Sequence, residues 1–364
     1  MRPTAIPAAL MRGGTSKGLM FLATDLPAEP RVRDAVLLAA MGSPDARQID
    51  GVGGAHPLTS KVAVVSASPR ADADVEYLFL QVWPDRAEVS DQQNCGNMLA
   101  AVGPFALERG LLSPRHERTP VRIWMQNTQS LAVATVETPD GQVTYEGDAA
   151  IDGVPGHHAP IPIEFLDVAG SSCGALLPTG RVVDEIESTR VTLIDNGMPV
   201  VCLAARDLGL EGYESPAQLE ADSGLRERLE AIRVRAGQLM NLGDVRGATV
   251  PKMSILSPAR HGGLINTRTF IPHRVHEAIG VFGAVSVATA CLLPGSVAHQ
   301  MTGGPVRAGR HDVTVEHPSG YFTVFLDVVV EADDVRVERA ALLRTARLLM
   351  DGAVMVPARV WERR

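Results

Sequence analysis

The chain has 364 residues and a formal net charge of -8; 45% of its residues are hydrophobic and 21% are charged. This length exceeds one ordinary core and predicts two domains. The hydrophobic share excludes a disordered chain. The negative charge, without any basic block, argues against a nucleic-acid-binding protein. No apolar run reaches the roughly 20 residues that span a bilayer, so we expect no membrane partner.

The N-terminus and the cysteines indicate the compartment. Residues 1–7 lack the apolar core of a signal peptide, so nothing suggests export. Cys95, Cys173, Cys202 and Cys291 lie far apart, without the C-x-x-C spacing of zinc or redox sites. In a chain of this length, that pattern is typical of reduced thiols. We therefore predict a cytoplasmic protein.

Many short elements are predicted, since the chain holds 34 glycines and 25 prolines. In the first half, alternating or β-branched runs predict strands at Leu19–Leu22, Lys61–Ser66, Val75–Val82, Val121–Trp124, Leu131–Thr138 and Gln142–Tyr145. Helical patterns cover Asp34–Met41, Met98–Leu107 and Ser223–Leu239. Asn94 is a candidate cap for the second of these helices, and Gly110 stops it.

After Pro178 the pattern restarts, with an Ala/Val-rich helix at Ser286–Leu293 and a last helix at Val337–Met350. Strands are predicted at Val191–Ile194, Val200–Ala204, Ser254–Leu256, Asp312–Glu316 and Phe322–Val330. We expect an α+β fold with two similar lobes and an active site in the cleft between them. Residues 1–180 form the first lobe and residues 181–335 the second. Residues 336–364, with the last helix, pack back on the first lobe.

The segment Asp91–Asn97 reads Asp-Gln-Gln-Asn-Cys-Gly-Asn and precedes the apolar helical run. A thiol at a helix start meets unpaired N–H groups and the positive end of the helix dipole, which favour thiolate. An arbitrary cysteine is more often a small packed residue. The flanking polar and glycine residues favour a proton-transferring or nucleophilic Cys95.

Two further segments of the first half carry candidate chemistry. Met11–Gly18 reads Met-Arg-Gly-Gly-Thr-Ser-Lys-Gly and suits a carboxylate or phosphate; the alternative is a solvated turn, and no P-loop pattern is present. Lys61 ends Asp50–Lys61, where an apolar strand begins. A packed stem and a partly desolvated ammonium favour a general base. By itself, Lys61 is better explained as a surface strand residue that caps a loop.

The second half offers weaker signals. Gly283–Ser286 opens an Ala/Val-rich helix, and His317–Gly320 is a small-residue turn between two strands. Both could hold anions, and both are equally explained as ordinary turns. Asn127 ends a strand and is a candidate cleft residue, whereas Cys173 reads as structural. No histidine spacing indicates a metal site.

These motifs together resemble the 2-methylaconitate cis-trans isomerase family, and within it the 4-oxalomesaconate tautomerase/isomerase branch. The family resemblance rests on Met11–Gly18, Leu58–Lys61, Asn94–Asn97 and His317–Gly320. The branch resemblance rests on Met41–Gly51, Val102–Leu111, Asn241–Val245 and Arg344–Arg347. Together they run from about residue 5 to the C-terminus.

The resemblance implies a diaminopimelate epimerase-like fold, with a sheet or open barrel around a central helix in each lobe. It also implies a cofactor-independent isomerase of an unsaturated tricarboxylate, in gallate- or protocatechuate-type aromatic degradation. Lys61 matches the family's general base and Cys95 its thiol partner. The expected substrate-binding residues are Arg12, Ser16, Lys17, Ser60, Gly96, Asn97, Asn127, Ser286, Ser319 and Gly320. The sequence leaves a homodimer open.

One departure concerns the second lobe. Epimerases of this fold place a cysteine at a helix start in each lobe, and the matching position here is Ser286. A hydroxyl is a poor partner for two-thiol inversion, so racemisation is disfavoured. Two alternatives stay open: isomerisation of 2-methylaconitate, which uses the same residues, and a non-catalytic organic-acid-binding protein of the same fold.

Overall fold

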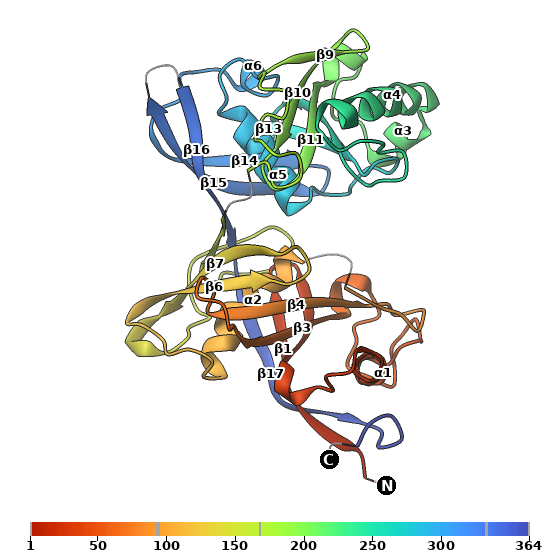
Figure 1. The fold of residues 1–364 in the computed structure, drawn as a ribbon, viewed down its shortest axis with the longest axis vertical. Helices are drawn as coiled ribbons and strands as arrows, with labels where there is room; N and C mark the ends of the chain where they lie inside the picture. Colours follow the sequence, from red (N-terminus) through yellow and green to blue (C-terminus); the bar gives the residue numbers. More distant parts are fainter. Residues whose placement is uncertain (1, 92–94, 167–168, 332–333, 363–364) are drawn as a thin grey trace. The chain divides into compact units, whose positions relative to one another are not determined.

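A computed structural model describes residues 2–91, 95–166, 169–331 and 334–362. The chain divides into two compact units (Figure 1). Unit 1 comprises Met1–Leu166 and Leu343–Arg364, and unit 2 comprises Asp167–Leu342. Asn94, the candidate helix cap, lies outside the described residues.

Unit 1 is a mixed sheet wrapped around a buried helix, α2 (Gly96–Glu108). Its strands are β1 (Thr4–Gly13), β2 (Ser16–Leu22), β3 (Lys61–Ala67), β4 (Val75–Val82), β5 (Val89–Ser90), β6 (Glu117–Met125), β7 (Ser130–Thr138), β8 (Ile161–Leu166) and β17 (Ala346–Val356). The strands pair in the order β17-β1-β2-β3-β4-β6-β7-β8. Of these, β1, β2, β3, β4, β6, β7 and β17 contact α2.

Helix α2 is apolar on every side, as expected of a helix surrounded by a sheet. All ten residues from Met98 to Leu107 are buried. A second helix, α1 (Pro30–Met41), lies over β4, β5 and β17, and its buried face includes Val36, Leu37 and Met41. Both ends of the chain meet in the antiparallel pair β1 and β17 (Figure 1).

Unit 2 has the same plan around α5 (Val281–Cys291), which contacts β10, β11, β14 and β15. Its strands are β9 (Asp184–Ile186), β10 (Thr189–Asp195), β11 (Pro199–Ala204), β12 (Lys252–Pro258), β13 (Ile265–Phe270), β14 (Gly309–His317), β15 (Gly320–Glu331) and β16 (Asp334–Arg344). They pair in chain order from β9 to β16. The other helices are α3 (Pro216–Ala221), α4 (Ser223–Leu239) and α6 (His299–Thr302).

The two units repeat one pairing pattern. The strand pairs are taken in order from β17 to β8 in unit 1 and from β9 to β16 in unit 2. In both units the third and fifth pairs are parallel, and the other five pairs are antiparallel. This order makes β12 the counterpart of β3, and α5 the counterpart of α2. Lys61 and Lys252 are therefore equivalent, since each begins the strand that pairs in parallel with its neighbour.

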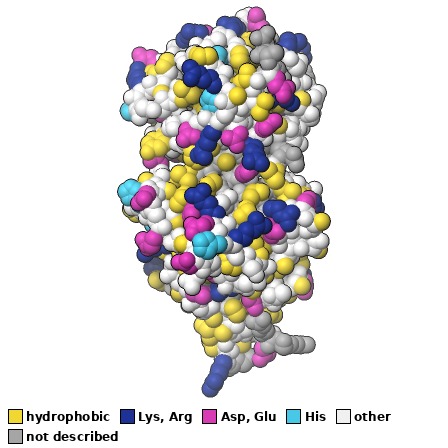
Figure 2. All heavy atoms as spheres, turned by 90° about the vertical axis from the view of Figure 1, so that its left-hand side faces the viewer, with side chains coloured by type: hydrophobic (Ala, Val, Ile, Leu, Met, Phe, Trp, Pro, Cys, Tyr) yellow, Lys and Arg dark blue, Asp and Glu magenta, His cyan; other side chains and the backbone are white. Residues whose placement is uncertain are grey.

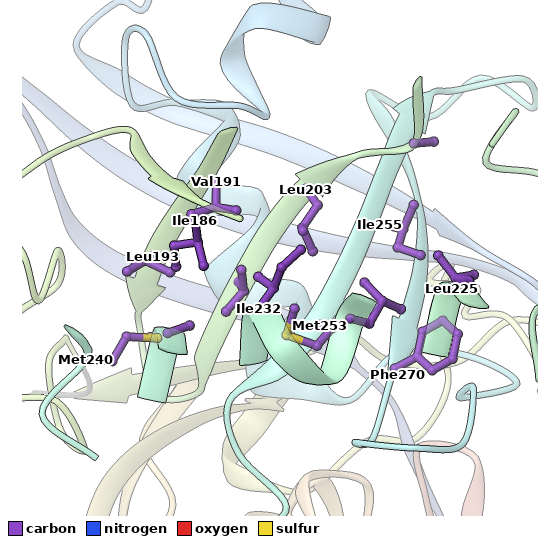
Figure 3. Packing of buried hydrophobic residues seen from close by; sticks show 14 of the residues in the cluster. Ile186, Val191, Leu193, Leu203, Leu225, Ile232, Met240, Met253, Ile255 and Phe270 are labelled. Carbon is purple, nitrogen blue, oxygen red and sulfur yellow. The ribbon is translucent and has the colours of Figure 1, made fainter. Parts of the chain in front are cut away.

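A second apolar layer in unit 2 packs α4 against the sheet. Figure 3 shows Ile232 and Met240 of this layer with Leu203, Met253 and Phe270. These side chains are buried, so α4 covers the face of β10, β11 and β12 that α5 does not. The charged run that predicts α4 is thus the solvent face of an amphipathic helix.

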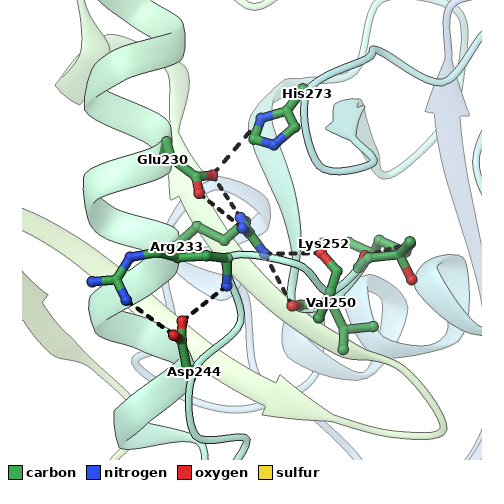
Figure 4. Close-up of polar contacts among 9 residues, drawn as sticks. Glu230, Arg233, Asp244, Val250, Lys252 and His273 are labelled. Atoms are coloured by element: carbon green, nitrogen blue, oxygen red, sulfur yellow. Dashed lines mark hydrogen bonds and ion pairs between the residues drawn. The ribbon is translucent and has the colours of Figure 1, made fainter.

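Arg233 joins α4 to the chain that enters β12. Its guanidinium forms two hydrogen bonds with Glu230, at 2.7 and 2.8 Å, and donates to the carbonyls of Ala248 and Val250 (Figure 4). His273 lies beyond, with Nδ1 at 3.8 Å from Glu230. Because the Arg233 side chain is fully buried, this pairing is what makes a charge tolerable inside the unit.

Two predicted elements are wrong. Residues 337–350 form parts of β16 and β17 and no helix, because β15 and β1 offer them pairing partners. Residues 142–145 lie outside every strand. Residues 169–180 belong with unit 2, although the sequence-based division assigns them to the first lobe. Asp195 holds that loop by accepting from the N–H groups of Ser172 and Cys173.

The surface and helices bear on the expected partners. On the face drawn in Figure 2, basic and acidic side chains are interspersed within each unit. Interspersed charge of this kind does not form the basic stripe that a phosphate backbone requires. Among the helices of the described residues, none combines the length and the apolarity that crossing a bilayer would take.

Glu316 yields a stability prediction. Its carboxylate accepts from the backbone N–H groups of Arg260, His261 and Gly263. Burial alone raises the pKa of Glu316, but these donors outweigh it and the pKa is lowered. Glu316→Gln should therefore reduce the free energy of unfolding of unit 2 by about 1–3 kcal/mol at pH 7.

The pH dependence of this effect follows from its sign. A lowered folded-state pKa gives stability that is present above the ordinary carboxyl range and lost as pH falls through the folded pKa. The deficit of Glu316→Gln should thus shrink in acid. Urea unfolding at neutral and acidic pH measures it, with the exposed Glu185→Gln as control. A deficit that is equal at both pH values would contradict the role of the charge.

Candidate active site

Cys95 is the N-cap of α2, in extended conformation at φ -128 and ψ 98. The predicted position of this thiol at a helix start is confirmed. The carbonyl of Cys95 accepts from Leu99 N–H and from the Tyr77 hydroxyl, at 3.2 Å. Its Sγ lies 4.0 Å from Ser16 Oγ, close enough for a hydrogen bond to sulfur. The thiol is thus held at the positive end of α2 beside a hydroxyl.

The two glycines of the first motif let β1 approach α2. A Cβ at Gly13 would lie 2.5 Å from the carbonyl oxygen of Asn97. A Cβ at Gly14, where φ is +50, would lie 2.2 Å from Asn97 Oδ1. Any larger residue would collide with the first turn of the helix. Asn97 also donates to Thr15 Oγ1 at 3.1 Å, so it clamps the turn that carries Ser16.

Lys61 is buried, with 7% of its surface exposed, at the start of β3. Its ammonium donates to Gln81 Oε1 at 3.1 Å and lies 5.0 Å from the centre of the Phe79 ring. No carboxylate of the described residues lies within ion-pair distance of it, since none of the ion pairs involves Lys61. A lysine held by an amide and a ring is not neutralised by a counterion.

One face of β4 connects Lys61 with Cys95. Tyr77, Phe79 and Gln81 alternate onto that face, since side chains two apart share a side of a strand. Tyr77 reaches the Cys95 carbonyl and Gln81 the Lys61 ammonium. The Cα atoms of Tyr77 and Gln81 are roughly 13 Å apart, since the two residues are four positions apart along β4 at about 3.3 Å per residue. Phe79 lies between Tyr77 and Gln81 on this face, and Lys61 Nζ lies over its ring.

Arg344 is a site residue that the sequence did not single out. Its guanidinium is buried in unit 1, and burial lowers the pKa of Arg344 to about 10, whereas the nearby Cys95 acts to raise it. A cation near the thiol can attract an anionic substrate. The only sequence signal was the Arg-Thr-Ala-Arg motif, and nothing in that motif says which arginine faces inward.

Arg12 and Lys17 are not brought to the thiol. Adjacent residues of a strand point to opposite faces. Ser16 faces Cys95, so Lys17 points away from it, and Arg12 shares the face of Lys17 because the two are directly opposite in β1 and β2. Both line a cavity that Ser16 also lines and that neither Cys95 nor Lys61 lines. The part of Arg12 and Lys17 in substrate binding therefore stays a prediction.

Two other predicted binding residues are engaged in structural hydrogen bonds. Asn127 accepts from Phe79 N–H and donates to the carbonyls of Phe79 and Asp91. Ser60 is fully buried, and its hydroxyl accepts from Gln48 at 2.6 Å. Their contacts therefore assign both side chains to holding strands and loops in place. Gly96, the first residue of α2, is next to the thiol, as predicted.

In unit 2 the predicted position of Ser286 at a helix start is wrong. Helix α5 begins at Val281 with Gly280 as N-cap, so Ser286 lies in the second turn. It is fully buried, donates to Met198 O and accepts from Asn196 N–H. Gly280 is the counterpart of Cys95, and it carries neither thiol nor hydroxyl. The case against two-thiol inversion is therefore stronger than the sequence indicated.

Ser319 and Gly320 lie in the hairpin between β14 and β15, where His317 pairs with Gly320. Ser319 donates to Glu277 O at 2.7 Å. Gly320 and His317 line a cavity of about 310 Å³ with Arg260 and Tyr213. These residues belong to unit 2, and their part in the reaction stays a prediction.

The remaining cysteines are buried thiols. Burial raises the pKa of Cys202 to about 12 and that of Cys291 further. Burial, followed by the charge of Asp195, raises the pKa of Cys173 to about 12. None of the three is poised to ionise near neutral pH. Within the described part of the chain, no three His, Cys, Asp or Glu side chains are grouped to hold a metal ion.

Comparison with known proteins gives full-length matches. The family model of the PrpF protein matches residues 4–357. The (4E)-oxalomesaconate Delta-isomerase of Novosphingobium sp. (strain KA1) is 60% identical, over 96% of this chain and 97% of that protein. The 4-oxalomesaconate tautomerase of Pseudomonas putida (strain KT2440) is 59% identical, over 99% of each.

A solved structure matches as fully. The crystal structure of methylitaconate-delta-isomerase superposes with a TM-score of 0.87 and 33% identity, over 100% of this chain and 98% of that one. The predicted α+β, diaminopimelate epimerase-like fold is confirmed. The sheet around a central helix is present in each unit.

Proposed function

We propose, from the premise that this chain belongs to the PrpF protein family, that it isomerises 4-oxalomesaconate by proton transfer. The observation that carries the proposal is the pair of reactive side chains in unit 1. Lys61 and Cys95 are anchored to one face of β4, and no carboxylate of the described residues forms an ion pair with Lys61. Two relatives of about 60% identity support the choice of substrate, since both are named for oxalomesaconate.

Lys61 acts as the general base in this proposal. Its neutral amine removes the carbon-bound proton beside the keto group, which the conjugated double bond makes acidic. Gln81 and the Phe79 ring orient the nitrogen, so that little entropy is lost when the substrate arrives. The electron pair released by the C–H bond passes into the conjugated system and gives a dienolate.

Cys95 acts as the acid at the other end of the conjugated system. Its S–H proton passes to the far carbon, or to oxygen in the keto–enol version, and completes the isomer. Lys61, now an ammonium, returns its proton to solvent, and the thiolate is reprotonated. The first N–H groups of α2 and the buried Arg344 stabilise the developing negative charge.

Solvent deuterium tests this mechanism. With 4-oxalomesaconate in D₂O, one deuterium should enter the carbon skeleton of the product during carbon protonation, as NMR or mass spectrometry will show. A keto–enol reaction instead gives deuterium only at exchangeable oxygen. Ultraviolet absorbance, followed with and without enzyme, measures turnover itself. An absorbance that the enzyme leaves unchanged would contradict the proposal and favour the non-catalytic organic-acid-binding protein.

A direct comparison of substrates separates the isomerases. The same assay with 2-methylaconitate should give a much lower kcat/KM than with 4-oxalomesaconate. The reverse order would assign the chain to the other reaction, since both use the same two side chains.

A further inference from the structure

We infer that unit 1 carries a second site, which binds a small oxyanion of the carboxylate or phosphate class. Neither Cys95 nor Lys61 lines its cavity, whereas Ser16, the first residue of β2, does. The cationic residues of this site are Arg12, Lys17 and Arg347, which lie side by side on three adjacent strands. The inference does not depend on the reaction proposed for Lys61 and Cys95.

The strand register places the three cations in one row. Arg12 of β1 is directly opposite Arg347 of β17 and directly opposite Lys17 of β2. Directly opposed side chains have Cβ atoms about 4.5–5.5 Å apart, and like charges at that spacing destabilise a sheet. Burial lowers the pKa of Arg12, and the neighbouring charge of Arg347 lowers it further. The row is therefore unfavourable without an anion.

No counter-charge of the described residues relieves this row. None of the ion pairs includes Arg12, Lys17 or Arg347. Arg12 Nη1 donates to Gly14 O and to both oxygens of Thr345. Arg12 Nη2 is buried and has no hydrogen-bond partner among the described residues. A buried guanidinium nitrogen without an acceptor is energetically costly, and an oxygen atom of a bound anion would remove that cost.

The cavity in front of the row has the size and lining for such an oxyanion. Its volume is about 270 Å³, just under the roughly 300–1,000 Å³ of pockets for drug-sized ligands. Val154 and Pro155 form apolar walls and His158 adds a ring nitrogen, while no aspartate or glutamate of the described residues lines the cavity. Apolar walls strengthen charge interactions by excluding water. Paired arginines recognise the planar oxygens of carboxylates and phosphates.

Calorimetry on the full chain tests the site. Inorganic phosphate and tricarballylate, a saturated tricarboxylate that cannot isomerise, are titrated separately into wild type and Arg347→Gln. The matched control is Arg359→Gln, which removes an exposed arginine of unit 1 outside the cavity. At least one anion should bind wild type and the control equally, and bind Arg347→Gln at least tenfold more weakly. Which anion shows this difference identifies the class.

Thermal unfolding gives an independent readout. Without anion, Arg347→Gln should melt at or above the wild-type temperature, because the repulsion with Arg12 is relieved. The anion should then raise the melting temperature of wild type more than that of the variant. Affinities that Arg347→Gln leaves unchanged, or the absence of binding of both anions to wild type, would overturn the site. A variant that melts lower without anion would assign Arg347 to packing.

Discussion

Lys61→Met should reduce kcat on 4-oxalomesaconate by about 10²–10⁴-fold, the range that a positioned general base contributes. Methionine keeps the length and much of the apolar contact of the lysine stem against Phe79, so the fold should persist. What disappears is the nitrogen that Gln81 holds. Initial rates by ultraviolet absorbance, with circular dichroism to verify folding, measure the loss.

The matched control is Lys252→Met. Lys252 begins β12, the counterpart of β3, and its ammonium donates to Thr249 O at 2.6 Å. This variant removes a lysine from the equivalent strand of unit 2 and should keep near wild-type turnover. Equal losses in both variants would point to a general effect of lost charge. Near wild-type activity in Lys61→Met would remove Lys61 from the reaction.

Cys95→Ser should reduce isomerisation by about 10²–10³-fold while substrate binding stays within a few-fold of wild type. A serine hydroxyl is a much weaker acid than a thiol, so it delivers the second proton poorly. The hydroxyl still fits beside Ser16, and the contacts of the Cys95 backbone with Tyr77 and Leu99 are unaffected. Single-turnover kinetics, with calorimetry for binding, separate the two effects.

Cys95→Ala and Cys291→Ala form the control pair. Both replace a buried thiol by a methyl group, one at the start of α2 and the other at the end of α5. Only Cys95→Ala should lose turnover, whereas Cys291→Ala should lose stability alone. Full activity in Cys95→Ala would exclude the thiol from proton transfer. A thioether adduct trapped with the native substrate would instead indicate a covalent mechanism.

The sequence by itself was sufficient where the signal is local. An apolar run directly after a polar and glycine-rich segment predicts a helix start, and Cys95 is the N-cap of α2. The β-branched run after Lys61 predicts a strand, and Lys61 begins β3. These positions depend on neighbouring residues only, so periodicity and capping are enough to place them.

Tertiary structure decided whatever depends on residues far apart in the chain. Residues 337–350 are strands because β1 and β15 pair with them, which no local pattern reveals. Arg12 and Lys17 lie away from the thiol because the register of β1 and β2 assigns their face. Ser286 is buried because α5 begins five residues earlier, at Val281. Arg344 lies near Cys95 only because the end of the chain returns to its beginning. Motifs therefore identified the reactive pair, whereas strand pairing between distant segments determined which charges surround it.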